Sequence, residues 1–301
     1  MSPEPLTNDP LASLDVFHGE LTVNRGVVFA RLPGFSSVDG YSLVGQARGP
    51  RSMHAQTLPA TTPLVDQGPG ESLLARGLVT DPSFWSPDVP AIYEVTVELR
   101  RHGQAIAQAK REIGFRPLSV RGQWLTYEGK PWVVRGVNTN SATECEPQAW
   151  REARAALVQE TVDHEALGAA SQFGAWAIVL LGGGAEAIYS QLKLLARHPA
   201  VAMVAIDDLK PDARPNQVAP NLLLAQYCSA GKVCEPAAWA KIVLAEVDAP
   251  QPFATRVAKI DRPVFAVRRL PDKRSVAEAR AACDELQRDL APFGQYAGYI
   301  V

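Results

Sequence analysis

The feature that most constrains this chain is a series of short, wholly apolar segments that alternate with helical stretches in its C-terminal part. Residues 176–181 and 201–206 are such segments, and a helical pattern over residues 185–197 separates them. Segments that are apolar on both faces and alternate with helices are typical of parallel strands with helical crossovers. The candidate strands are residues 132–137, 176–181, 201–206, 221–227, 241–247, 263–267 and 296–301.

Two architectures fit this set of strands, a reduced (β/α) TIM-like barrel and an open doubly wound sheet. Residues 147–169 read as one helix, which would merge two β/α units into one. The part after residue 118 has about 180 residues, whereas an eight-stranded barrel typically needs ~250. The hydrophobic pattern alone therefore leaves both architectures open.

The N-terminal part has a different period. Residues 91–101 alternate between apolar and polar positions, Gly103 can turn the chain, and residues 105–115 can return as a second strand. Shorter β-rich runs precede them at 14–17, 21–23, 27–30 and 41–47, with an edge loop expected over 55–69. Several short strands without a helical pattern predict a β-sandwich. We expect a flexible tail over residues 1–12, the sandwich over 13–117 and the β/α domain over 118–301.

Composition excludes several kinds of partner. The formal net charge is −2, and acidic and basic residues are interspersed, so nothing favours nucleic acid or an anionic membrane. No apolar stretch reaches about 18 residues and the N-terminus does not resemble a signal peptide, so we expect a cytoplasmic protein that does not bind a membrane.

Neither a metal nor a cofactor is expected from the sequence. The four cysteines, Cys145, Cys228, Cys234 and Cys283, lack the spacing of a zinc site, and we expect buried free thiols. Gly182–Gly184 fits neither a P-loop nor a dinucleotide fingerprint, so a plain strand-to-helix turn is favoured.

The junction between the two parts carries four linked motifs. They are the Trp-Ser-Pro-Asp-Val-Pro run from Trp85 that leads to Tyr93, Gly-Phe-Arg at 114–116, Tyr-Glu-Gly-Lys-Pro at 127–131 and Arg-Gly-Val-Asn at 135–138. In this order and spacing the chain resembles the family 2 glycoside hydrolases, the group of β-galactosidase, β-glucuronidase and β-mannosidase. The resemblance implies an immunoglobulin-like sandwich, with Trp85 and Tyr93 in its core, followed by a degenerate TIM barrel.

The same resemblance places the catalytic positions. It implies an acid/base Glu after the fourth barrel strand, where this chain has Asp207 and Asp208, and a nucleophilic Glu after the seventh, where it has Arg268. Retaining glycosidases need two carboxyl groups about 5 Å apart. A guanidinium stays protonated and cannot act as a nucleophile, so we expect no catalytic residues.

Other residues are expected near the barrel mouth. The resemblance places Arg135 near the sugar site, and we expect it in an ion pair because an unpaired buried charge is costly. Asn138 ends the first predicted strand, and Glu246 lies at the end of residues 241–247.

The sequence thus predicts a catalytically inactive relative of the glycosidases that binds a carbohydrate or a protein partner, or serves as a scaffold. The alternative is an active β-glycosidase with displaced carboxylates, Asp208 and Glu246.

Overall fold

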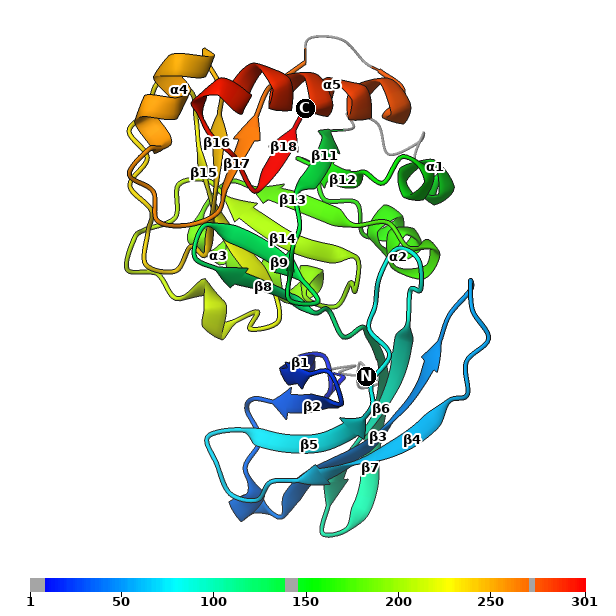
Figure 1. Ribbon diagram of the computed structural model, residues 1–301. Helices are drawn as coiled ribbons and strands as arrows, with labels where there is room; N and C mark the ends of the chain where they lie inside the picture. Colours follow the sequence, from blue (N-terminus) through cyan, green and yellow to red (C-terminus); the bar gives the residue numbers. More distant parts are fainter. Residues whose placement is uncertain (1–8, 139–145, 271–273) are drawn as a thin grey trace, which may run out of the picture. The chain divides into compact units, whose positions relative to one another are not determined.

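The computed structural model describes residues 9–138, 146–270 and 274–301 (Figure 1). The chain divides into two compact units. The sandwich unit comprises Met1–Arg51, Gln56–Ser83 and Ala91–Phe115. The barrel unit comprises Arg116–Val301 together with two short excursions, Ser52–Ala55 and Phe84–Pro90. A multidomain β plus α/β fold is therefore confirmed.

The sandwich unit is a curled, immunoglobulin-like antiparallel sheet of seven strands in the order β1-β2-β5-β4-β3-β6-β7. β4 joins the two halves of this sheet. Most of its length pairs with β3, and its last residues, Val65 and Asp66, pair with β5. The strands are β1 (Asp15–Thr22), β2 (Arg25–Leu32), β3 (Tyr41–Arg51), β4 (Ala60–Asp66), β5 (Leu73–Thr80), β6 (Ile92–Arg101) and β7 (Gln104–Ile113). The helix of its described residues is one 3-10 turn, η1 (Ser37–Asp39).

Two strands of this sheet were not expected. The predicted edge loop over residues 55–69 contains β4, in which only Leu64 is buried, so its pattern carries little signal. β5 alternates regularly, with Leu73, Ala75 and Val79 inside, and could have been recognised from its period of two. The core is as expected at Tyr93, whose ring packs edge-on against Phe115 at 4.9 Å between ring centroids.

The barrel unit contains a closed barrel of eight parallel strands, β11 to β18. The open-sheet alternative is therefore excluded. The strands are β11 (Val134–Asn138), β12 (Ala156–Gln159), β13 (Ala177–Leu181), β14 (Val201–Ile206), β15 (Leu223–Cys228), β16 (Ile242–Glu246), β17 (Val264–Val267) and β18 (Gly298–Ile300). The strand missing from the sequence analysis is β12, which interrupts the helix predicted over residues 147–169.

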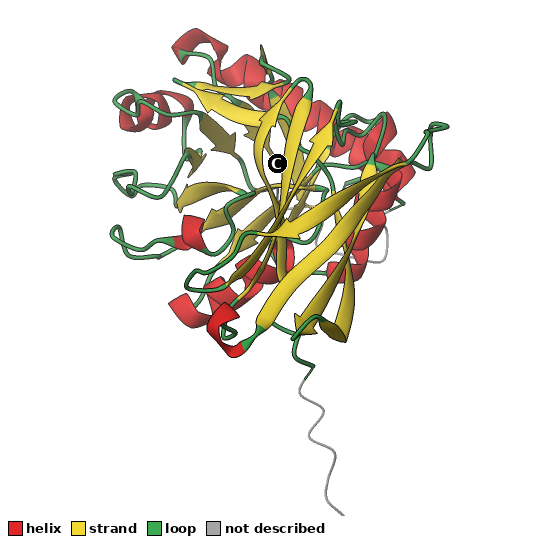
Figure 2. Ribbon diagram, turned by 90° about the horizontal axis from the view of Figure 1, so that it is seen from below, coloured by secondary structure: helices red, strands yellow, loops and turns green. Residues whose placement is uncertain are grey.

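The barrel is shortened in its helices rather than in its strands. The α-helices, red in Figure 2, are α1 (Pro147–Glu152), α2 (His164–Phe173), α3 (Ala185–Leu195), α4 (Pro250–Val257) and α5 (Val276–Leu290). Only a 3-10 turn, η3 (Pro215–Gln217), joins β14 to β15, and the connection from β15 to β16 contains no helix. A further turn, η4 (Ala291–Phe293), follows α5. Of the described helices, none is long and apolar enough to cross a membrane.

A small antiparallel sheet and an aromatic cluster lie at the N-terminal ends of the barrel strands. The sheet consists of β8 (Leu118–Arg121), β9 (Trp124–Tyr127) and β10 (Lys130–Pro131). Trp176, just before β13, contacts the rings of Tyr127, Trp132 and Trp85. Trp85 is fully buried, but its indole donates to the Ser171 carbonyl of α2, so it packs in the barrel unit and not in the sandwich core that the resemblance implied.

Arg116, the arginine of the Gly-Phe-Arg motif, is buried at the same end of the barrel. Its guanidinium donates to the carbonyls of His198, Pro199 and Val201, which lead into β14, and of Asn221, which precedes β15. Burial lowers the pKa of Arg116 to about 10. The motif therefore ties together the entrances of two neighbouring strands through backbone acceptors.

Candidate functional site

A cavity of about 730 Å³ opens at the C-terminal ends of the barrel strands. This end carries the active site in TIM-barrel enzymes, because the loops that follow the strands converge there. The walls come from the ends of β11, β12, β13, β17 and β18, from α1 and from the first turn of α5. Its polar and aromatic lining residues are Asn138, Trp150, Glu152, Glu160, Arg268, Arg269, Arg274 and Ser275.

A hydrogen-bonded network, which we call the Arg269 bridge, crosses this mouth. Arg269 follows β17, and its Nε lies 2.7 Å from Oε1 of Glu246 at the end of β16. Its Nη1 lies 2.7 Å from Oε1 of Glu160, just after β12. Tyr227 on β15 donates its hydroxyl to Glu246 and accepts from Arg269, while Asn138 on β11 donates to Glu160 at 3.0 Å. One guanidinium thus holds two carboxylates from opposite parts of the rim.

The bridge sets the protonation of its members. Burial alone would raise the pKa of Glu246, but hydrogen bonds from Tyr227, Arg269 and the backbone N–H of Ala230 outweigh it, and the net pKa is lowered. Burial and the hydrogen bond to Glu246 raise the pKa of Tyr227. Glu246 is therefore held as a carboxylate and Tyr227 as a neutral phenol.

Two buried polar atoms on the cavity wall have no hydrogen-bond partner among the described residues. They are the Nε1–H of Trp150, a residue that is 1% exposed, and Oδ1 of Asn138. Buried polar atoms are normally satisfied, so an orphan donor and an orphan acceptor beside a cavity are suited to a ligand or to ordered water.

Of the residues singled out from the sequence, Asn138 and Glu246 belong to the bridge. Arg268 borders the cavity, but its side chain extends to Asp289 of α5, with 2.8 Å between Nη2 and Oδ2. Neighbouring residues at a strand end point to opposite sides. For this reason Arg269, and not Arg268, faces the carboxylates.

Arg135 does not reach the mouth. It forms an ion pair, with 3.0 Å between its Nε and Oδ1 of Asp284 in α5, and its guanidinium lies over the ring of Tyr299. Its partners place it on the helix side of β11, while Gly136 beside it approaches Ile300 and Val158. Arg135 therefore does not line the cavity at the mouth.

Asp207 and Asp208 follow β14 and are exposed. Neither lines the cavity, neither side chain contacts another described residue through a hydrogen bond or ion pair, and Asp208 has a left-handed φ of 57°. The carboxylate that meets Glu246 across the mouth is Glu160, which the sequence analysis missed because it follows the unrecognised strand β12.

The expected free thiols at Cys228 and Cys234 are also corrected. The two residues form a disulfide, with 5.8 Å between their Cα atoms, across a turn that contains Gly231 at a left-handed φ of 73°. Cys283 is a buried free thiol, and Cys145 lies outside the described residues. No group of three or more metal-ligating side chains gathers in the described ranges.

Comparisons with known proteins agree with this architecture. Residues 50–116 match the model of the glycosyl hydrolases family 2. A family 2 member from Bacteroides cellulosilyticus superposes with a TM-score of 0.64 at 14% identity, over 96% of this chain and 43% of that one. Bacteroides uniformis β-glucuronidase 2 gives 0.61 at 12%, over 98% and 46%. A putative β-galactosidase from Bacteroides fragilis gives 0.58 at 11%, over 96% and 54%.

The resemblance to family 2 is confirmed. The solved structures support it at the level of the fold, and this chain spans about half of their length. β14 and β17 are the fourth and seventh strands of the barrel, in the positions that the resemblance implied. Arg268 and Arg269 follow the seventh strand, and the exposed Asp207 and Asp208 follow the fourth strand.

Proposed function

We propose that this family 2-like protein is a catalytically inactive pseudo-glycosidase whose barrel mouth binds a carbohydrate. The observation that carries the proposal is the Arg269 bridge. A guanidinium follows the seventh strand and forms ion pairs of 2.7 Å with both Glu246 and Glu160.

The bridge is incompatible with a two-carboxylate mechanism. A retaining glycosidase needs one carboxylate free to attack the anomeric carbon and one carboxylic acid to protonate the leaving oxygen. Arg269 binds Oε1 of each glutamate, and its charge opposes protonation of either carboxylate. The lowered pKa of Glu246 removes the obvious proton donor.

Binding does not need those groups to be free. Ligand sites combine an apolar wall with a few fixed polar atoms, and Val158, Leu180 and Ile300 supply the apolar part here. The orphan Nε1–H of Trp150 and Oδ1 of Asn138 lie behind the cavity surface, and a turn of either side chain toward the cavity would let it donate to or accept from a hydroxyl group. A sugar presents hydroxyl groups of both kinds on a compact ring.

Binding can be tested with the purified chain and a panel of monosaccharides, with the melting temperature and calorimetric titration as measurements. We expect at least one sugar to raise the melting temperature. Trp150→Phe keeps an aromatic ring but removes the N–H donor. It should lower the affinity for that sugar by about tenfold, the scale of one unmade buried hydrogen bond. Lys193→Ala, on the exposed side of α3, is the matched control. A folded chain that no sugar stabilises would contradict the carbohydrate role and favour a scaffold.

The alternative, an active glycosidase with displaced carboxylates, gains little support from the placement of its residues. Glu246 is at the mouth, but Asp208 is exposed and does not line the cavity. Hydrolysis of p-nitrophenyl β-glycosides that disappears in both Asp208→Ala and Glu246→Gln would establish this alternative.

A further inference from the structure

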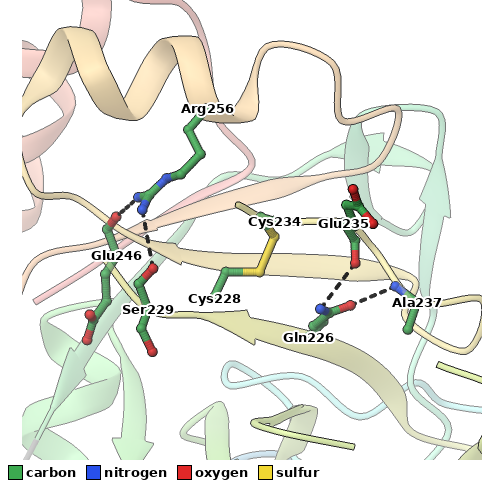
Figure 3. Close-up of a disulfide and its surroundings, with 8 residues drawn as sticks. All are labelled: Gln226, Cys228, Ser229, Cys234, Glu235, Ala237, Glu246 and Arg256. Atoms are coloured by element: carbon green, nitrogen blue, oxygen red, sulfur yellow. Dashed lines mark hydrogen bonds between the residues drawn. A yellow bond between two sulfur atoms is a disulfide. The ribbon is translucent and has the colours of Figure 1, made fainter. Parts of the chain in front are cut away.

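The segment that follows β15 is attached to the Arg269 bridge. The backbone N–H of Ala230 donates to Oε2 of Glu246 at 2.9 Å, on the oxygen that Arg269 and Tyr227 leave free. Arg256 of α4 links the carbonyl of Ser229 to the carbonyl of Glu246, as Figure 3 shows. The segment from Ser229 to Val233 is thus part of the wall that positions Glu246.

Very little apolar packing holds this segment. Residues 230–233 are all exposed, and Val233 is 83% exposed. At its two ends stand Cys228 and Cys234, both buried and joined by the disulfide (Figure 3). Beyond Cys234, Gln226 holds the chain through the carbonyl of Glu235 and the N–H of Ala237. The covalent link therefore closes a short exposed loop whose other anchors are single hydrogen bonds.

We propose that the Cys228–Cys234 disulfide is a redox clamp on the barrel mouth. The oxidised form holds residues 229–233 against Glu246, and reduction by a dithiol releases the segment and loosens the Arg269 bridge. In this step a thiolate of the dithiol attacks one sulfur, which breaks the Cys228–Cys234 bond and forms a mixed disulfide. The second thiolate of the dithiol then attacks that mixed disulfide and displaces the protein sulfur. Cys228 and Cys234 together gain two electrons and two protons and become thiols. The reductant becomes a cyclic disulfide.

The inference deepens the proposed function, because it assigns regulation to the same mouth. Disulfides persist in oxidising compartments and are rare where glutathione and thioredoxin keep thiols reduced. If the protein moved from an oxidising to a reducing compartment, the hydrogen bonds that Glu246 accepts would change. The carboxylate would then lose the N–H of Ala230, and without that anchor it would hold Arg269 and Tyr227 less firmly.

The clamp can be tested without any sugar, so its failure is distinct from failure of the proposed function. The measurement is hydrogen exchange of the Arg269 Nε–H in the full-length ¹⁵N-labelled protein, with the signal assigned by its loss in Arg269→Lys. Thiol titration in denaturant reports the redox state. In dithiothreitol we expect exchange to become about tenfold faster, the scale of losing one hydrogen bond to a charged group.

Two variants make the test independent of reduction. Cys228→Ser/Cys234→Ser should behave as the reduced protein does. Ala230→Pro keeps both cysteines but removes the N–H, so it should accelerate exchange at Arg269 with the disulfide intact. Lys232→Ala, an exposed residue of the same segment, should leave exchange unchanged. Equal protection of the Arg269 Nε–H in fully oxidised and fully reduced wild-type protein would overturn the proposal, even if a variant fails to fold.

Discussion

The Nε of Arg269 lies 2.7 Å from Oε1 of Glu246, so the end of the seventh barrel strand is joined by an ion pair to the end of the sixth. A second ion pair carries the same guanidinium to Glu160 beyond the second strand. One guanidinium at the barrel mouth is thus shared by two carboxylates that come from opposite parts of the rim.

Removal of the central cation should lower stability modestly. Arg269→Ala leaves the carboxylates of Glu246 and Glu160 without their shared cation, but the Arg269 side chain is 57% exposed, so solvent weakens the effect. We expect a loss of ~1 kcal/mol in the free energy of unfolding at neutral pH. Urea denaturation measures it, with Arg274→Ala, an exposed arginine on the same cavity, as the control. An unchanged or higher stability would mean that the bridge contributes nothing.

A much larger effect is expected at the other end of the barrel. Arg116 is 5% exposed and donates to four backbone carbonyls, of which that of His198 also accepts from the N–H of Val201. Arg116→Ala should cost ~3 kcal/mol or more, because it leaves buried acceptors unsatisfied and opens a cavity. The exposed Arg121→Ala should stay within about 0.5 kcal/mol of wild type. Similar denaturation midpoints for the two variants would contradict the structural role of Arg116.

The stability of the barrel unit should also depend on pH through His198. Burial lowers the pKa of His198 to about 4, and the nearby His164, Arg197 and Arg116 add to the effect. The unfolded chain binds this proton near pH ~6.5, so the folded state loses stability as the pH falls from ~6.5 toward ~4, by at most ~3 kcal/mol. Above ~6.5 this contribution is fully present.

Urea denaturation at about pH 7.5 and about pH 4.5 checks this dependence. His198→Gln removes the titrating ring and should flatten the slope between the two conditions. The ring of His164 is stacked on that of His198, with 3.0 Å between Nδ1 and Nε2, so His164→Gln tests the contribution of the neighbour. A wild-type slope that persists in His198→Gln would assign the pH dependence to other groups.

Besides holding residues 229–233 at the barrel mouth, the disulfide should raise the free energy of unfolding. Its loop spans a sequence separation of 6, and closing so short a loop in the unfolded chain is worth ~2 kcal/mol in the chain-entropy model. The Cys228→Ser/Cys234→Ser protein should therefore unfold at a lower urea concentration than wild type under oxidising conditions. In dithiothreitol the two should converge, and a difference that remains there would point to packing rather than to the covalent link.

Much of the fold could be predicted from the sequence, because strands buried on both faces leave a strong pattern and the junction motifs are specific. β12 escaped because Ala156–Gln159 is four residues long and lies between two alanine-rich helical stretches. β4 escaped because it buries little on either face.

For the candidate site, the sequence predicted the position of the arginine after the seventh strand to within one residue. Counting along the seventh strand reaches Arg268, whereas the ion pairs with Glu246 and Glu160 are formed by Arg269, one residue further. Glu160 could not be found without β12. The partners of Glu246 are far apart in sequence, so no local pattern joins Tyr227, Glu246 and Arg269. Cys228 and Cys234 give no local signal either, since their pairing depends on the turn at Gly231.

Hydrolysis of p-nitrophenyl β-glycosides by the purified chain tests the proposed loss of glycosidase chemistry at the barrel mouth. The panel should include the β-galactoside, β-glucuronide, β-glucoside and β-mannoside, with wild type compared with Glu246→Gln and Asp208→Ala. We predict release of p-nitrophenol at the rate of the buffer blank for all three proteins. Turnover by wild type that is abolished in Glu246→Gln would contradict the proposal that the barrel mouth is catalytically inactive.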